Sequence, residues 1–537
     1  MCVSLVPQAQ AQQSNQPVAL ISIAPLDGVL NNTSYMLRAC NVPEMSGLVT
    51  IMANQYSQGL DRSKPLGALV TLQDGIPTAM IFLPMVDRDQ FFGALAGAGI
   101  EPDDLGDGLF EIDTGGQVVY AKHAGNWMFI AQTEDALANV PADPERLLGD
   151  LPQRYDLAVR LNVQALPAEM KSMATEQIRI GFERSVAAQA NQSPEEAESA
   201  REMGEASLKQ IEELIRDTEQ FILGWKVDST ARKTYLDAAA QFVAGSKLAQ
   251  QCEDAKSLTT RYGKFVLPDA ALEFRYASVI NDPTDKAVAK NNLRSSMQQI
   301  QQQIENSGDV PEPAVAVLEG LLDSIADVME KTIDEGVFEG AGSVSLADNT
   351  LRVLLGGRLA DGHALAAAFK EAIDKVPPSN RDVKVEFDYD SYGGYQLHRI
   401  SGPIKIADPA ARAALGDNLT IILGTADKGY LVVLDPTGDA AARQAIDNLN
   451  NAQPEPAVPF DSVVRLQPIL QFASAVAPNP IIEQAADVAS QSQGNDTISI
   501  SARLITRGGV YRLSIDEGVL RTIGTAAKAG SGQPQGF

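Results

Sequence analysis

The feature that most constrains this chain is that similar segments recur in the same order in its two halves. In the first half, ALVTL and TAMIFL flank Asp74-Gly75 and precede a helical pattern. In the second half, SVSL and LRVLL flank Asp348-Asn349 and also precede one. Short alternating runs around a tight turn are typical of β-hairpins. The first recurring unit is therefore a hairpin followed by a helix.

Further segments match in the same order. DLAVRLNV begins at Asp156 and DSVVRLQP at Asp461, and their first six positions share four identities. The other matched pairs are VALISIA with AALEFRY, the strands around Gly115-Gly116 with those around Gly393-Gly394, GNWMFIAQT with GDNLTIILGT, and FILGWKVDSTARKTYL with ISISARLITRGGVYRL. Repeats of this kind indicate one structural unit used twice, so we predict an internal duplication.

Strands and helices in this order predict an α+β fold of two tandem homologous copies, each an antiparallel sheet covered by helices. Copy one is expected over residues 17–250, a linker over 251–264 and copy two over 265–527. Copy one is also expected to contain an inserted helical hairpin at about 167–220. The Gly- and Gln-rich end, 528–537, is expected to be a disordered tail.

The first residues suggest export. MCVSLV is a short apolar run, and Ala9-Gln10-Ala11 has the small-x-small pattern preferred by signal peptidase, although a cationic start is missing. We interpret residues 1–16 as the remnant of a signal peptide with a flexible start, which predicts a periplasmic or secreted protein. A disordered cytoplasmic terminus is the alternative.

Composition excludes several classes of partner. The chain has 43 Lys and Arg against 69 Asp and Glu, a net charge of -26, which disfavours nucleic acid. No apolar run reaches the roughly 18 residues of a spanning helix, so no transmembrane segment is expected. Cys2 would leave with the leader, and Cys40 and Cys252 are expected to be free thiols, with one disulfide between them left open.

Motifs of catalysis are missing from the sequence. It has no Gly-x-Ser-x-Gly elbow, no phosphate-binding loop and no His-Glu-x-x-His helix. Of its three histidines, His123 and His398 follow the double glycines and are expected to face solvent on strands, and His363 stands elsewhere. Residues 101–113 are rich in carboxylates but fail the calcium-loop pattern. We therefore predict no enzyme, no catalytic, metal or cofactor-binding residues and no cofactor.

Some remaining residues are expected to be structural. Glu386, Asp388 and Asp390 alternate and should share the wet face of one strand. Trp127 and Trp225 should anchor the core of copy one. Arg160 and Arg465 are expected to pair with internal carboxylates, such as those at the start of the two matched DxxVRL segments.

One stretch resembles a known group of proteins. The segment RSKPLGALVTLQDGIPTAMIFLPMVDRDQFFGAL, from Arg62 to Leu95, is similar to segments of uncharacterised exported bacterial proteins, notably large planctomycete-type secreted proteins. The resemblance implies export and a two-repeat α+β fold. It implies no activity and no functional residue.

Three hypotheses for function follow. The first is a non-enzymatic exported scaffold or protein-binding module of the cell envelope. The second is a carrier of an apolar small ligand in a sheet-helix cavity, and the third, an unrecognised hydrolase, has the least support. A flat sheet face over a packed interior would favour the scaffold, and a closed apolar cavity would favour the carrier. The sequence leaves the oligomeric state, the partner and the role of each copy open.

Overall fold

The structure, a computed structural model, describes residues 17–73, 75–189, 194–307, 312–376, 383–403, 412 and 418–531. The predicted leader, 1–16, lies outside this part of the chain. Contacts divide the chain into two compact units. Unit 1 contains Met1–Ser34, Ser46–Ser172 and Glu219–Lys226; unit 2 contains Tyr35–Met45, Met173–Thr218 and Val227–Phe537. Each unit is described by itself below.

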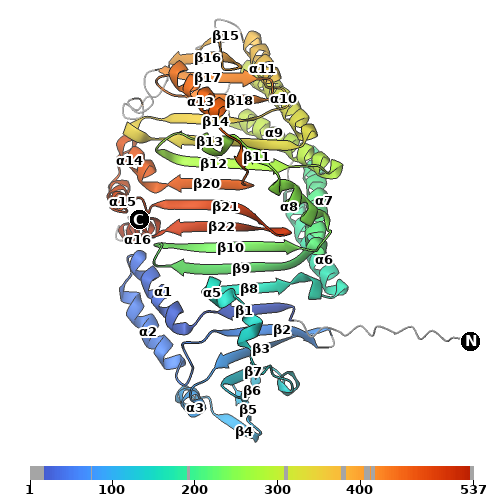
Figure 1. Ribbon diagram of the computed structural model, residues 1–537, viewed down its shortest axis with the longest axis vertical. Helices are drawn as coiled ribbons and strands as arrows, with labels where there is room; N and C mark the ends of the chain where they lie inside the picture. The colour runs from blue at the N-terminus through green and yellow to red at the C-terminus, as the bar shows by residue number, and fades with distance from the viewer. Residues whose placement is uncertain are drawn as a thin grey trace, which may run out of the picture. The chain divides into compact units, whose positions relative to one another are not determined.

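Unit 1 is built on an antiparallel sheet whose described strands follow the order β9-β8-β1-β2-β3-β7-β6-β5-β4 (Figure 1). The strands are β1 Ala19–Ile23, β2 Leu66–Gln73, β3 Ile76–Pro84, β4 Pro102–Gly106, β5 Leu109–Asp113, β6 Val118–Ala124, β7 Trp127–Ala131, β8 Leu157–Asn162 and β9 Thr218–Asp228. Of β9, residues 219–226 belong to this unit.

Short helices cover one face of the unit 1 sheet. They are the 3-10 turn η1 Glu134–Leu137, α4 Glu145–Leu148 and α5 Leu151–Arg154. Leu137, Leu148, Leu151 and Tyr155 are buried against this face together with Leu20, Leu69, Met80, Phe82 and Ala158. Gly224 permits the close approach, because a Cβ there would lie 2.6 Å from the Tyr155 ring. This side of the sheet holds the packed core.

The longer helices of this part of the chain follow β1 and β3. They are α1 Leu26–Ala39, α2 Glu44–Tyr56 and α3 Arg88–Gly97. Helix α3 begins where it does because the Asp87 carboxylate accepts hydrogen bonds from the backbone N–H groups of Asp89 and Gln90. In contrast to α3, which buries Phe91, the helix α2 buries none of its residues.

In unit 2 the strands pair antiparallel in the order β10-β22-β21-β20-β12-β13-β14-β18-β17-β16-β15. The strands are β10 Lys233–Phe242, β12 Ala270–Val279, β13 Val337–Ser345, β14 Arg352–Arg358, β15 Lys384–Tyr392, β16 Tyr395–Pro403, β17 Asn418–Ala426, β18 Gly429–Leu434, β20 Phe460–Arg465, β21 Thr497–Ile505 and β22 Gly508–Asp516. A separate ribbon pairs β11 Thr259–Thr260 with β19 Glu455–Pro456.

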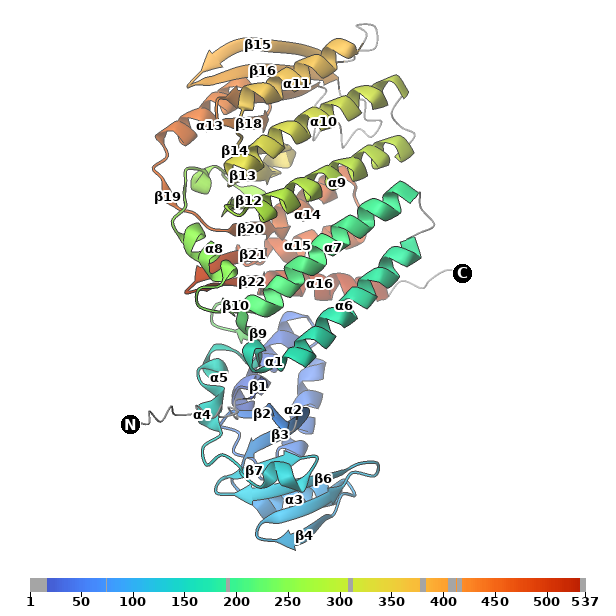
Figure 2. The same ribbon diagram turned by 90° about the vertical axis from the view of Figure 1, so that its right-hand side faces the viewer.

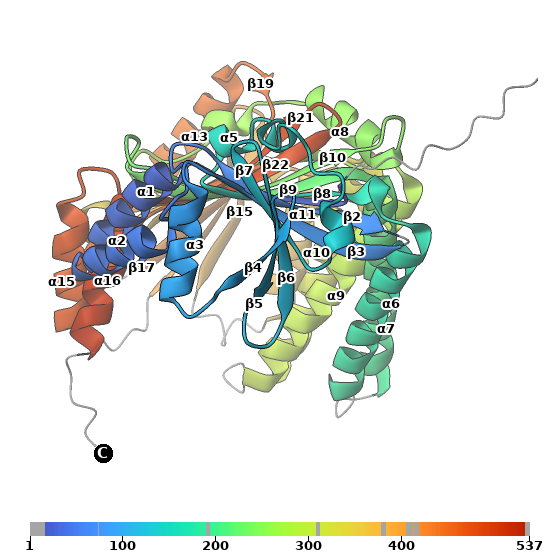
Figure 3. The same ribbon diagram turned by 90° about the horizontal axis from the view of Figure 1, so that it is seen from below.

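Helices stand at both ends of the unit 2 strands (Figure 3). At one end lie α9 Pro283–Ser307 and α10 Glu312–Glu335, with α7 Pro194–Asp217 beside α9 (Figure 2). At the other end lie α14 Leu466–Val476, α15 Pro480–Ser490 and α16 Glu517–Ser531. The remaining helices are α8 Lys247–Lys256, α11 Gly362–Lys375 and α13 Asp439–Asn451, whereas α6 Ala168–Gln189 begins in unit 1 and continues in unit 2. The helix α16 continues past Lys528, the predicted start of the tail, and residues 532–537 lie outside the described chain.

The predicted α+β class and the antiparallel pairing are confirmed, but two sequence matches are displaced by one strand. The strands around Gly115-Gly116, β6 and β5, are second and third from β3, whereas their proposed equivalents around Gly393-Gly394, β16 and β15, are third and fourth from β14. NWMFIAQT contains β7, which pairs with β3 of the first hairpin. Its proposed equivalent, NLTIILGT, lies in β17, whereas the strand paired with β14 of the second hairpin is β18. The displacement has a simple cause: neighbouring apolar strands have similar sequences, and only hydrogen-bond partners distinguish them.

Candidate functional site

The histidines do not form a site. His398 was predicted to face solvent, but it is 2% exposed on β16. Its Nδ1 accepts from the Asp388 backbone N–H, and its Nε2 lies 3.1 Å from the Thr425 hydroxyl. Burial lowers the pKa of His398, and the nearby Asp388 carboxylate opposes that effect. His123 lies in unit 1 and His363 begins α11, 3.1 Å from Asp427. Thr425 lies diagonally across from His398 on β17, because the register pairs His398 with Leu423.

The carboxylates predicted to be structural are paired or turned. A β-bulge between Glu386 and Asp390 moves Asp388, at φ 49°, off the predicted shared face and toward His398. Glu386 and Asp390 keep a common face, opposite Arg399 and Leu397, and Glu386 contacts Lys384 and Arg399. Residues 102–113 form the β4-β5 hairpin rather than a loop, and the described residues contain no group of three or more potential metal ligands.

The two arginines of the matched segments have different outcomes. Arg160 donates to the Leu147 backbone carbonyl at 2.9 Å rather than to a carboxylate. Arg465 does pair with a buried carboxylate, Glu273 at 3.0 Å, although not with Asp461. The predicted partners have other contacts: Asp156, which is buried, contacts Lys226 at 2.8 Å, and Asp461 lies 3.5 Å from Arg275. The identical residues of the two matched segments therefore lie in different electrostatic environments. The Trp127 prediction is confirmed, since Trp127 is buried edge-on against Phe82 at 5.9 Å.

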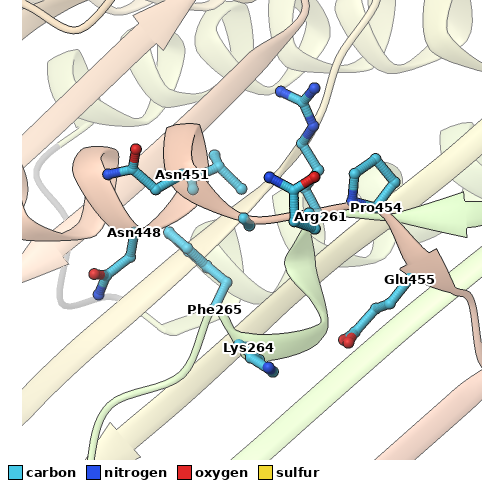
Figure 4. A pocket seen from close by; sticks show the side chains of 10 residues that line it. Arg261, Lys264, Phe265, Asn448, Asn451, Pro454 and Glu455 are labelled. Carbon is cyan, nitrogen blue, oxygen red and sulfur yellow. The ribbon is translucent and has the colours of Figure 1, made fainter.

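Unit 2 has a pocket of about 550 Å³ beside the end of α13 (Figure 4). Its polar lining comes from Arg261, Lys264, Asn448, Asn451, Gln453 and Glu455. Most of these polar side chains, including the two cations and the amides, are exposed on a turn and a helix end. Phe265 and Leu449 line the wall but belong to the packed core beneath. The pocket is an open hollow in the surface with a mixed polar and apolar lining, not the enclosed apolar cavity that a carrier requires.

A second apolar surface in unit 1 lies on the other face of the sheet from the core. Register places fifteen adjacent apolar side chains on this face over five neighbouring strands: Phe221, Leu223, Trp225, Leu157, Val159, Leu161, Ala19, Ile21, Ile23, Leu66, Ala68, Val70, Ala79, Ile81 and Leu83. Strand alternation continues this face through Leu72 and Pro77 of the β2-β3 hairpin and ends it at Glu219 on β9. We call the fifteen apolar residues the unit 1 open face. Six of them remain 37–42% exposed: Ile21, Ile81, Leu157, Val159, Phe221 and Leu223. Soluble monomers rarely expose contiguous apolar patches of this kind without a binding role.

The open face ends where a helix covers it. Beyond β3, the same side of the sheet continues through β7, β6 and β5 and carries Met128, Ala121 and Phe110, all buried. Helix α3 packs on these residues through Phe91 and Phe92, and the rings of Phe92 and Phe110 lie 4.6 Å apart. One sheet face is thus covered at β5–β7 and open at β9–β3.

Unit 2 shows the same contrast between its faces. Leu236, Leu513 and Ile500 lie side by side on β10, β22 and β21 and are 36–43% exposed. The reverse face of these strands is polar, where Arg512 forms two hydrogen bonds with Asp237 at 2.7 and 2.8 Å. Farther along, α10 and α11 cover the apolar face by packing around Leu423. In an isolated sheet the polar face meets water and the apolar face needs a cover.

The cysteines and the helices of the described residues bear on two of the remaining predictions. Cys40 and Cys252 are free thiols, and burial raises the pKa of each. No helix in the described segments combines the length and apolar character needed to cross a membrane. Comparison with known protein families, with curated proteins and with solved structures gives no significant match to this chain.

Proposed function

We propose that this protein is a non-enzymatic binding protein or scaffold, exported to the cell envelope, which holds a protein partner on its open apolar sheet faces. The observation that carries the proposal is the unit 1 open face, where fifteen neighbouring positions are apolar and the large ones remain partly exposed. Export is supported by the small-x-small pattern at Ala9-Gln10-Ala11 and by the resemblance of 62–95 to exported proteins.

The interior argues for a surface rather than a cavity as the place of binding. Buried aromatic and aliphatic side chains fill the space between sheet and helices, as in the cluster of Phe91, Phe110 and Met128 in unit 1. Unit 2 has a similar cluster around Leu397, Leu431 and Ile446. The pocket beside α13 is open to solvent and has a mixed polar and apolar lining. An apolar ligand therefore finds its complementary surface on the open faces.

We also propose that the chain is a tandem duplication. The support is that β9-β8-β1-β2-β3-β7-β6-β5-β4 and β21-β20-β12-β13-β14-β18-β17-β16-β15 correspond strand by strand in order along the chain and in pairing. Helix pairs also occur at equivalent places: α1–α2 with α9–α10, and α6–α7 with α14–α15. In this interpretation α6 and α7, where Phe182 packs on Gly204, are a lengthened helix pair rather than an insertion. An experimental structure in which the two strand sets fail to superpose would contradict the duplication.

The binding proposal is tested by photocrosslinking in the native envelope. A photoreactive amino acid replaces Leu223, on the unit 1 open face, and in a second strain it replaces Ile76, a 66% exposed residue at a hairpin turn. We expect a discrete protein adduct from position 223 that is weak or missing from position 76. Equal adducts from both positions, or none from position 223, would refute a partner on this face. Fractionation of the same cells tests export.

A further inference from the structure

Unit 1 itself shows which kind of element can cover this side of its sheet. Where this side of the sheet is covered, over β5–β7, the cover is the helix α3. Three apolar side chains of α3, Phe91, Phe92 and Leu95, contact the sheet, and its other side is exposed. A helix of about 10 Å diameter covers two to three strands at their spacing of about 4.8 Å. The curvature and residue sizes of this sheet therefore accept an amphipathic helix.

Backbone hydrogen bonding restricts the conformation of a polypeptide on this face. The strands β8, β1, β2 and β3 are each paired on both sides within unit 1, so their peptide groups are already used. An extended peptide lying on the apolar side chains would leave its own N–H and C=O groups without partners. A helix satisfies these groups internally. A polypeptide that covers the open face is therefore helical.

A single acyl chain is a poorer cover. Its width is about that of one strand spacing, and the open face spans five strands. One chain would leave most of the six partly exposed large side chains in water. A helix face carrying side chains at i, i+3, i+4 and i+7 reaches several strands at once. The area to be covered thus favours a helix over a lipid tail.

Charge indicates the polar side of the partner helix. The segments of unit 1 contain nine Lys and Arg against nineteen Asp and Glu. The open face itself carries no charged residue among its fifteen positions. A unit with this net negative charge attracts a helix whose apolar stripe is bordered by Lys and Arg, and it repels an acidic helix.

We propose that the unit 1 open face is a helix-docking surface that takes a basic amphipathic helix of a protein partner. This inference rests on the proposed binding function and specifies its partner class. The helix lies across β9, β8 and β1 in the manner of α3 on β5–β7. Its apolar stripe covers Leu223, Val159 and Ile21, and its cationic border suits the net negative charge of unit 1.

The test uses the full chain and a fluorescein-labelled peptide of leucine and lysine with helical amphipathic spacing. Fluorescence anisotropy is measured at about 0.1 M salt with the native protein and with Val159→Gln/Leu223→Gln, which keeps the net charge. Ile76→Gln, a change outside the open face, is the matched control, and far-ultraviolet circular dichroism verifies the fold of each variant. We expect saturable binding that weakens at least tenfold in the double variant and less than twofold in the control.

Three further outcomes would overturn the inference. A scrambled peptide of the same composition that binds equally well would show charge attraction without helix docking. A glutamate-for-lysine peptide of equal affinity would refute the charge argument. Displacement of the peptide by a neutral monoacylglycerol at submicellar concentration would assign the face to an acyl chain. Failure here combined with a protein adduct from position 223 leaves the binding function intact and rejects only the helical partner class.

Discussion

The openness of the unit 1 face can be measured by comparing two adjacent residues of β1 that point to opposite sides. Leu20 is 1% exposed in the packed core, and Ile21 is 37% exposed on the open face. Each is changed to alanine in the full chain. The two positions are well matched because they are adjacent on the same strand and their side chains have the same size.

The expected costs follow from how much surface each side chain covers. Truncation of Leu20 removes fully buried carbons and leaves a cavity, which costs about 2–5 kcal/mol of unfolding free energy. Ile21 has roughly two thirds of its surface covered and leaves no enclosed cavity, so its truncation costs about 1–2 kcal/mol. With a urea m-value of about 2 kcal/mol/M, Leu20→Ala should lower the midpoint by about 1–2.5 M and Ile21→Ala by about 0.5–1 M.

Tryptophan fluorescence makes the assay specific for this unit. The chain has two tryptophans, Trp127 and Trp225, and both belong to unit 1. Urea transitions followed by fluorescence therefore report unit 1 even if unit 2 unfolds separately. Equal midpoint shifts for Leu20→Ala and Ile21→Ala would mean that the open face is covered in solution. That result would refute the reasoning on which the candidate site depends.

Two further predictions concern a glycine pair and a histidine. Gly224→Ala should destabilise unit 1 by about 1–3 kcal/mol because the new Cβ would meet the Tyr155 ring at 2.6 Å, whereas Gly93→Ala, in open space within α3, should stabilise it by about 0.5–1 kcal/mol. The same fluorescence transitions test both, and a stabilising Gly224→Ala would contradict the packing. Because burial lowers the pKa of His398 from its ordinary 6.5, its contribution to stability is complete above that pH and is lost as pH falls toward the lowered value. Thermal unfolding from pH 7.5 to 5 should show this loss, and His398→Asn should flatten it; a histidine NMR signal titrating above 6.5 would reverse the sign.

Much of the architecture could be predicted from local sequence signals. The alternating runs of β2 and β3 around Gly75 predicted a hairpin, and Pro478 and Pro480 mark the break between α14 and α15. Pairing partners were harder, because β17 and β18 are both apolar and β-branched. Choosing the strand beside β14 needs the hydrogen-bond register, which depends on contacts between residues far apart in the chain.

The open face was missed for a related reason. A strand with one wet face alternates apolar and polar residues, but ALISI in β1 and FILGW in β9 are apolar at nearly every position. Such runs are typical of strands that are covered on both sides. One helical cover for the sheet was predicted from the sequence. In the structure a second apolar face remains, and the described chain of unit 1 places a helix on it only over β5–β7.

An uncovered apolar face must also be reconciled with a chain that does not aggregate before it meets its partner. The large negative charge opposes aggregation, because a net charge of -26 makes two copies repel each other at distances beyond the range of apolar attraction. The same charge attracts a basic partner, and its effect weakens with salt over a Debye length of about 8–10 Å. High salt should therefore promote self-association through the open face and at the same time slow capture of a basic helix. The opposite responses of these two processes to salt distinguish a protected binding surface from an apolar patch that lacks a function.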